Sequence, residues 1–117
     1  MDELLAESDV VVDLLPVQDA TKGYFNEATF GQMKPSAFFI NTGRAHSVDE
    51  AAVVKVLSEG RIAGAAIDVF WLEPLPAGHP ITKLPNVLLT PHTAGGTPQG
   101  TINGMAGWTD IFEKLNE

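Results

Sequence analysis

The chain has 117 residues, which is about one domain and is small for a complete two-substrate enzyme. Its hydrophobic fraction of 44% and charged fraction of 19% are those of a globular protein, and its net charge of −8 argues against a nucleic-acid partner, because phosphate binding needs clustered Lys and Arg. The lack of cysteine excludes disulfides, thiolate metal sites and cysteine nucleophiles.

The sequence gives no sign of a membrane segment, a secretory signal or a metal site. No run approaches the roughly 18 apolar residues of a membrane span, and residues 1–3 are acidic rather than basic. We therefore expect no membrane partner, no bound metal and a cytoplasmic location.

The first part of the chain predicts a short helix followed by a strand. Residues 2–7 fit the last turns of a helix with Leu4 and Leu5 facing inward. Residues 10–15 form an apolar run that predicts a strand buried on both faces. The strand is expected to end at Pro16, because proline cannot donate to the hydrogen-bond ladder of a sheet.

A second helix and strand are expected next. Residues 26–33 predict a short helix capped by Asn26. Residues 37–44 begin with a continuous apolar run, which predicts a second strand buried on both faces. This run ends in small polar residues, a glycine and Arg44.

A longer helix is expected after the second strand. Ser47 and Glu50 have the spacing of a capping box and predict the start of a helix near Ser47. Gly60 is the natural end of this helix. Its core-facing stripe is expected to consist of Val53, Val56 and Leu57.

The last part of the chain predicts two more strands and a helix. Residues 63–70 and 86–90 are the third and fourth strands, and the four prolines of residues 71–85 predict an irregular loop between them. A final helix is expected from Thr97, with Trp108 in its apolar stripe. This alternation implies an α/β fold with a mostly parallel sheet of about four strands and covering helices.

Four side chains suited to acid–base or anion chemistry lie at or just past predicted strand ends. They are Arg44, Asp68, Glu73 and His92. In a parallel sheet the carboxyl ends of the strands share one edge, where ligands bind. Arginine presents a planar fork of donors to a carboxylate, and histidine titrates near neutral pH. An Arg, Glu and His together suit a step that moves one proton on a small anionic substrate.

Each of these residues also has an alternative, purely structural explanation. Arg44 could pair with a nearby acid, and His92 could satisfy a backbone carbonyl at the strand end. Glu73 could be a solvated loop acid, and Asp68 could cap a neighbouring segment. The aromatic residues of the apolar runs are expected in the core, including Phe38, Phe39, Trp108 and Phe112. The remaining histidines are expected to be structural: His46 and His79.

Three separated motifs carry a resemblance to a known family. They are Asn-Thr-Gly-Arg at residues 41–44, Gly-Ala-Ala-Ile-Asp-Val-Phe with Glu-Pro-Leu at residues 64–75, and Pro-Asn-Val leading to Thr-Pro-His at residues 85–92. In order and spacing they resemble the D-isomer-specific 2-hydroxyacid dehydrogenases over essentially the whole chain. Residues 8–23 resemble the same family's earlier signature, and their Leu-Leu-Pro form resembles the glyoxylate/hydroxypyruvate reductase branch.

The resemblance implies a role for each candidate residue. Arg44 would bind the carboxylate and carbonyl oxygen of a small 2-keto or 2-hydroxy acid. His92 would exchange a proton with that oxygen as hydride moves to or from NAD or NADP, and Glu73 would hold His92. Asp68 would face the nicotinamide carboxamide. The cofactor would be lined by Leu15, Thr21, Thr42, Gly43, Arg44, Asp68, His92 and Gly95.

One feature of dinucleotide-binding domains is not found in the sequence. Nothing matches the Gly-x-Gly-x-x-Gly loop with an acidic residue about twenty positions later. We therefore expect residues 1–117 to be the second half of a dinucleotide-binding domain, a partial Rossmann-like domain without the glycine-rich first half or the substrate domain. As an isolated chain it is expected to have little or no turnover.

Without the first half of the domain, the strand predicted at residues 10–15 would lie at the edge of the sheet. In the family's sheet it would pair with the first half of the domain, so here it would be an exposed apolar edge, which favours pairing with another chain. We therefore expect self-association or a partner that covers residues Val10–Leu15. Two other functions stay open: a non-catalytic binding or assembly module of this family, and an unrelated parallel α/β ligand-binding protein.

Overall fold

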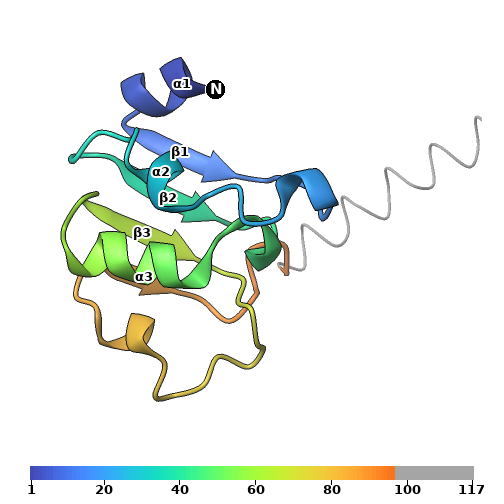
Figure 1. The fold of residues 1–117 in the computed structure, drawn as a ribbon. Coiled ribbons are helices and arrows are strands. Elements are labelled where there is room, and N and C mark those ends of the chain that lie inside the picture. The colour runs from blue at the N-terminus through green and yellow to red at the C-terminus, as the bar shows by residue number, and fades with distance from the viewer. Residues whose placement is uncertain (97–117) are drawn as a thin grey trace, which may run out of the picture.

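The four strands pair side by side in a parallel sheet, and their order in the sheet is their order in the chain (Figure 1). This computed structural model describes residues 1–96; the helix expected from Thr97, with Trp108 and Phe112, lies outside the described residues. The elements are α1 (Asp2–Glu7), β1 (Val10–Asp13), η1 (Asp19–Thr21), α2 (Glu27–Phe30), β2 (Phe38–Asn41), η2 (Ala45–Ser47), α3 (Glu50–Ser58), β3 (Gly64–Ile67), η3 (Pro80–Lys83) and β4 (Val87–Leu89).

The predicted α/β architecture is confirmed, since all three strand pairs run parallel. Helix α2 connects β1 to β2 and α3 connects β2 to β3, and Figure 1 shows both helices on the same face of the sheet. The pairing registers are regular, so that Val11, Phe39 and Ala65 lie in one row across three strands. The four carboxyl ends consequently share one edge.

The core lies between the sheet and these two helices. Phe39 is completely buried, and its ring centroid lies 4.8 Å from that of Phe25 and 5.1 Å from that of Phe30. Burying each such side chain contributes about 1.5–3 kcal/mol. The predicted stripe of α3 is buried against the sheet: Val53, Val56 and Leu57.

The opposite face of the sheet is exposed, so the prediction that the first two strands are buried on both faces is wrong. Phe38, expected in the core, is 51% exposed, and Val10 and Leu88 are 49% and 64% exposed. The strand pleat directs these side chains away from the helices, and no element among residues 1–96 covers them. A continuous apolar run indicates that both faces of a strand are apolar, but it does not show whether residues of the same chain pack against both faces of the sheet.

Two predictions near the N-terminus differ from the structure, one on the end of a strand and one on the burial of a side chain. Strand β1 ends at Asp13 rather than at residue 15, because the Asp13 side chain accepts a hydrogen bond from the Leu15 backbone N–H at 3.0 Å and turns the chain. In α1, Leu5 is buried as expected, but Leu4 is 51% exposed. A helix of six residues packs through one side only, and Leu4 faces the other.

Local sequence signals predict the start of α2 and the irregular loop correctly, but they place the start of α3 too early. Asn26 caps α2 as predicted, accepting from the Ala28 and Thr29 backbone N–H groups. Helix α3 begins two residues later than the capping box implies, because Asp49 is the cap and accepts from the Ala52 backbone N–H. The loop at residues 71–85 is irregular apart from the short 3₁₀-helix η3.

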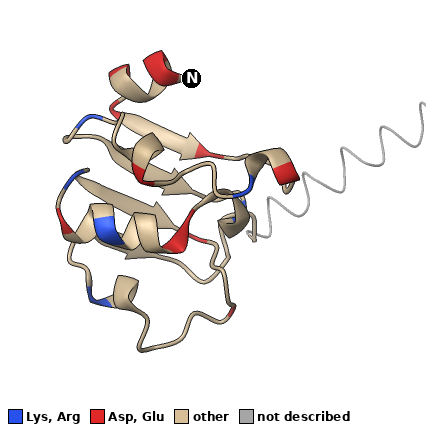
Figure 2. Ribbon diagram, in the orientation of Figure 1, with Lys and Arg blue, Asp and Glu red and all other residues tan. Residues whose placement is uncertain are grey.

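Charged residues lie mainly on helices, loops and strand ends, as Figure 2 shows. None of the helices within residues 1–96 combines the length and the apolar character that crossing a bilayer would require.

Candidate active site

The carboxyl edge of the sheet carries all four candidate residues. Arg44 follows β2, Asp68 and Glu73 follow β3, and His92 follows β4. Pairing continues past the strand ends, because the Asp68 backbone N–H donates to the Asn41 carbonyl at 3.0 Å. The parallel arrangement therefore places three loops of very different sequence position next to one another.

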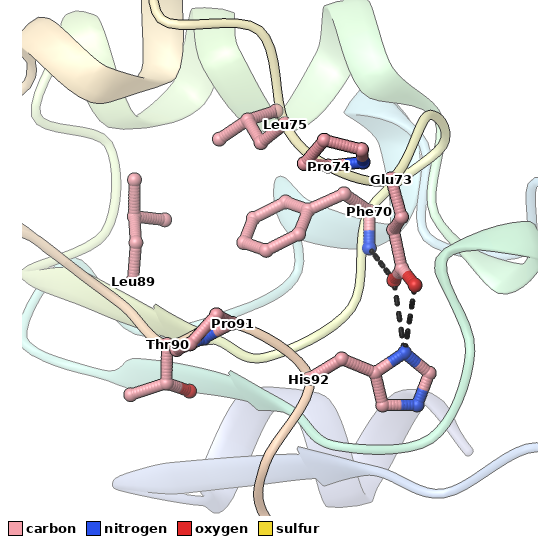
Figure 3. A pocket seen from close by; sticks show the side chains of 8 residues that line it. All are labelled: Phe70, Glu73, Pro74, Leu75, Leu89, Thr90, Pro91 and His92. Carbon is pink, nitrogen blue, oxygen red and sulfur yellow. Dashed lines mark hydrogen bonds and ion pairs between the residues drawn. The ribbon is translucent and has the colours of Figure 1, made fainter.

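Glu73 and His92 form the closest contact between the candidates (Figure 3). The Nδ1 atom of His92 lies 2.8 Å and 3.0 Å from the two carboxylate oxygens of Glu73. The Phe70 backbone N–H also donates to Oε1 of Glu73, at 3.0 Å. The hydrogen bond from His92, followed by that from Phe70, holds the pKa of Glu73 below its ordinary value, so this carboxylate is ionised at neutral pH.

His92 has an unusual backbone conformation that Asp68 supports. Its φ is 55°, in the left-handed region that residues with a side chain rarely adopt. Asp68 is 3% exposed and accepts from the Thr90 hydroxyl on one side of His92 and from the Thr93 and Ala94 backbone N–H groups, at 2.9 Å and 3.0 Å, on the other. Asp68 therefore caps the segment that carries His92.

The charge state of Asp68 follows from these contacts. Burial alone would raise its pKa, but the hydrogen bonds from Thr90, Ala94 and Thr93, together with the nearby His92, outweigh burial and lower the pKa below the ordinary value. An ionised Asp68 accepts all three hydrogen bonds at once, which a protonated carboxyl does less well.

The second ring nitrogen of His92 is available. Nε2 has no hydrogen-bond partner among the described residues, and in Figure 3 it lies on the side of the ring away from Glu73, Leu75 and Leu89. Behind the pair is a mainly apolar cavity of about 340 Å³, lined by Phe70, Glu73, Pro74, Leu75, Leu89, Thr90, Pro91 and His92. Nε2 is therefore free to contact a ligand on the side of the ring away from Glu73.

Arg44 lies on the same edge but does not touch the Glu73–His92 pair. Asn41 shapes its turn: the side-chain oxygen accepts from the Gly43 backbone N–H at 3.0 Å, and the side-chain amide donates to the Arg44 carbonyl at 3.2 Å. The exposed guanidinium donates to the Gly43 carbonyl at 2.7 Å. Within residues 1–96 it makes no ion pair with an acid, leaving most of its donors for a ligand.

Two buried polar residues of this edge have roles that the sequence did not predict. Asp13, at the end of β1, is 1% exposed and accepts a hydrogen bond from the hydroxyl of Ser47, which is also 1% exposed. The Ser47 oxygen lies 2.9 Å from the Arg44 carbonyl oxygen. The capping-box pattern obscured this role, because it assigns Ser47 to a helix start. An aspartate at the end of an apolar run was the available signal.

The residues that the resemblance assigns to the cofactor lie in the loops of this edge. Leu15 donates its backbone N–H to Asp13, and the Thr21 hydroxyl donates to the Pro16 carbonyl at 2.6 Å. Thr42 and Gly95 are exposed. These positions leave the cofactor roles as predictions.

The other two histidines hold loops, in agreement with the structural role expected for them. His46 contacts the Gln18 carbonyl through Nε2 at 2.9 Å, and His79 contacts Glu50 through Nε2 at 2.6 Å. Across residues 1–96, no three His, Asp or Glu side chains gather as they would around a metal ion.

Comparison with known proteins identifies the family. Residues 1–94 match the sequence pattern described as "D-isomer specific 2-hydroxyacid dehydrogenase, NAD binding domain". The chain belongs to this family. It is 50% identical over 97 residues to a glyoxylate reductase of Thermofilum pendens, covering 83% of this chain and 29% of that protein. It is 41% identical over 117 residues to glyoxylate/hydroxypyruvate reductase B of Klebsiella pneumoniae, covering 99% of this chain and 36% of that protein.

Solved structures of this dehydrogenase family have the same fold. An NADPH-dependent glyoxylate/hydroxypyruvate reductase from Sinorhizobium meliloti superposes with a TM-score of 0.77 at 38% identity, covering 82% of this chain and 50% of that one. A probable 2-hydroxyacid dehydrogenase from Rhizobium etli, in complex with NADP, superposes with a TM-score of 0.79 at 33% identity, covering 97% of this chain and 38% of that one. The chain spans only about a third of the length of its curated relatives.

Proposed function

We propose that this chain carries the acid–base residues and the nicotinamide side of an NAD- or NADP-dependent 2-hydroxyacid dehydrogenase acting on a small 2-keto acid such as glyoxylate or hydroxypyruvate. The observation that carries the proposal is the Glu73–His92 pair, 2.8 Å apart at the carboxyl edge of a parallel sheet, with Nε2 of His92 on the side of the ring away from Glu73. The names of the curated relatives support the substrate class.

The proposed mechanism assigns one task to each side chain. Arg44 binds the carboxylate of the keto acid through its free donors. Nε2 of His92 gives a proton to the carbonyl oxygen, and takes it back in the oxidation direction. Glu73 accepts from Nδ1 and keeps the ring oriented, while Asp68 holds the backbone on both sides of His92. The nicotinamide, when bound, supplies or receives the hydride, so that keto acid, hydride and proton give the hydroxy acid.

The residues present fit the nicotinamide end of such a cofactor better than its pyrophosphate. The loops that follow the four strands lie at one edge of the sheet together with His92, and the resemblance assigns six lining positions there besides Arg44 and His92: Leu15, Thr21, Thr42, Gly43, Asp68 and Gly95. The sequence has no glycine-rich fingerprint for a pyrophosphate. We therefore propose that residues 1–117 correspond to the second half of a dinucleotide-binding domain.

A chimera tests this function. The 117 residues replace the matching segment of the Klebsiella pneumoniae reductase, and NADH and NADPH oxidation are followed with glyoxylate and hydroxypyruvate. We expect a soluble, active chimera in which His92→Ala lowers kcat by about 10²–10⁴-fold, the usual contribution of a general acid. A folded chimera without activity, or one indifferent to His92→Ala, contradicts the proposal. The isolated chain should show little turnover.

A second candidate function, an assembly module, is favoured by the exposed apolar side of the sheet. We propose that β1, an edge strand paired only with β2 among the described residues, pairs with β1 of a second copy. The exposed Val10 and Val12 of β1 would gain side-chain neighbours from the added strand in such an assembly. Light scattering at micromolar concentration should then report a dimer or larger species, and a monodisperse monomer contradicts self-association.

A further inference from the structure

The loop that carries Glu73 is attached to the start of α3 by two aromatic side chains with no part in the proposed mechanism. The indole N–H of Trp71 donates to the carbonyl of Val48 at 2.8 Å. The ring of Trp71 stacks on that of His79, with centroids 6.2 Å apart and planes inclined by 15°. Nε2 of His79 lies 2.6 Å from Oε1 of Glu50, the first residue of α3.

The hydrogen-bond partners of His79 determine the roles of its two ring nitrogens. The backbone N–H of Ile81 donates to Nδ1 at 3.2 Å, so Nδ1 is the acceptor nitrogen. Nε2 therefore carries the proton and donates it to Glu50. Ile81 is completely buried, which fixes the far end of the loop. Both ring nitrogens of His79 are thus occupied, and the ring is a rigid support for Trp71.

These contacts join the two parts of the candidate active site. Val48, which accepts from Trp71, is four residues after Arg44 and directly follows the 3₁₀-helix η2 (Ala45–Ser47). Trp71 is itself two residues before Glu73. Arg44 and the Glu73–His92 pair do not contact each other directly. The hydrogen bond from Trp71 to Val48 therefore connects the segment that carries the proposed anion-binding arginine to the loop that carries Glu73.

We propose that Trp71 is a positioning residue that sets the location of the Glu73–His92 pair relative to Arg44. The inference rests on the proposed function, in which one keto acid must reach Arg44 with its carboxylate and His92 with its carbonyl oxygen. A displacement of about 1 Å between such groups can cost on the order of 100-fold in rate. A ring of this size, partly buried, stacked and hydrogen-bonded, restricts that displacement in a loop that contains several prolines.

Trp71→Phe isolates the hydrogen bond, because phenylalanine keeps an aromatic ring against His79 and lacks the indole N–H. Leu72→Ala is the matched control: Leu72 is the next residue of the same loop and is 65% exposed. The full 117-residue chain, labelled with ¹⁵N, is titrated with hydroxypyruvate while the Arg44 side-chain and His92 ring signals are followed by NMR. Urea unfolding of each variant measures stability separately.

In the unmodified chain and in Leu72→Ala, we expect both sets of signals to shift with one dissociation constant. In Trp71→Phe, the Arg44 signals should still shift, whereas the change at His92 Nε2 should fall by at least about half, because hydrogen bonds weaken steeply with misalignment. A loss of stability alone would reduce the shifts of the Arg44 and His92 signals to the same extent. Unchanged shifts at both residues in Trp71→Phe overturn the inference.

Two further outcomes are distinguishable. If the unmodified chain shows no shift at either residue, the inference is overturned, whereas the proposed function is decided separately by the activity of the chimera. If Trp71→Phe does not fold, Glu50→Ala replaces it, since this change removes the acceptor of His79 at an exposed position in the first turn of α3. A reduced His92 shift in Glu50→Ala then supports the inference, and a shift equal to that of the unmodified chain overturns it.

Discussion

Asp68 should be the residue on which the conformation of the His92 segment depends most. Its buried carboxylate accepts three hydrogen bonds, from the hydroxyl of Thr90 and from the backbone N–H groups of Thr93 and Ala94. In Asp68→Asn one carboxylate oxygen becomes an N–H₂ group, which can no longer accept from a backbone N–H. At least one charge-assisted hydrogen bond is lost, so we expect a loss of about 2 kcal/mol in the free energy of unfolding.

Urea unfolding followed by circular dichroism measures this loss. With a slope of about 1–2 kcal/mol per molar urea, the midpoint should fall by about 1–2 M at pH 7. Asp19→Asn is the control, because Asp19 is exposed, and it should leave the midpoint nearly unchanged.

The pH dependence of the same difference gives a second test. The pKa of Asp68 is lower in the folded chain than its ordinary value, so its stabilisation is fully present above the unfolded pKa of about 3.9 and is lost as the pH falls through the folded pKa. The gap between the parent chain and Asp68→Asn should therefore narrow below about pH 3.9. Equal midpoints at pH 7, or a gap that does not change with acidification, would refute the reasoning.

Two further predictions concern the packing of the sheet. Phe39→Ala should lower the free energy of unfolding by about 3–5 kcal/mol, whereas Phe38→Ala, on the exposed face, should lower it by less than about 1 kcal/mol in a monomer. Thermal unfolding compares the two variants, and similar losses would mean that both faces of the sheet are covered. Gly64→Ala should lower the free energy of unfolding by about 1–3 kcal/mol, because an added Cβ would lie 2.7 Å from the Asn86 carbonyl oxygen. Gly78→Ala is the control, since a Cβ there has open space and should be tolerated. Equal stability of these two variants in thermal unfolding contradicts the β3–β4 packing.

The sequence was sufficient for the architecture because each of its signals is local. Apolar runs, turn residues and one side-chain cap define the strands and α2, and alternation of strands and helices then implies a parallel sheet. Asn26 illustrates this, since its cap depends only on the two or three residues that follow it. Gly60, which has a φ of 64° and follows the end of α3, is another local signal, and it predicts the end of this helix correctly.

The failures concern contacts between distant residues. Ser47 is placed by a hydrogen bond to Asp13, 34 residues earlier, so its capping-box pattern was misleading. The exposure of Phe38 depends on which chain covers the second face of the sheet, and its own strand does not contain that information. For the site, the strand ends predict a shared edge, but they do not decide whether Asp68 caps a segment or faces a ligand. The structure shows that Asp68 accepts three hydrogen bonds from a segment more than twenty residues later in the chain.

The most direct test of the proposed site is a crystal structure of the 117-residue chain soaked with hydroxypyruvate. We expect the carboxylate of the keto acid on the guanidinium of Arg44 and its carbonyl oxygen about 3 Å from Nε2 of His92, with Nδ1 of His92 still on Glu73. A keto acid bound elsewhere, or one that reaches Arg44 while its carbonyl lies beyond the reach of His92, would contradict it.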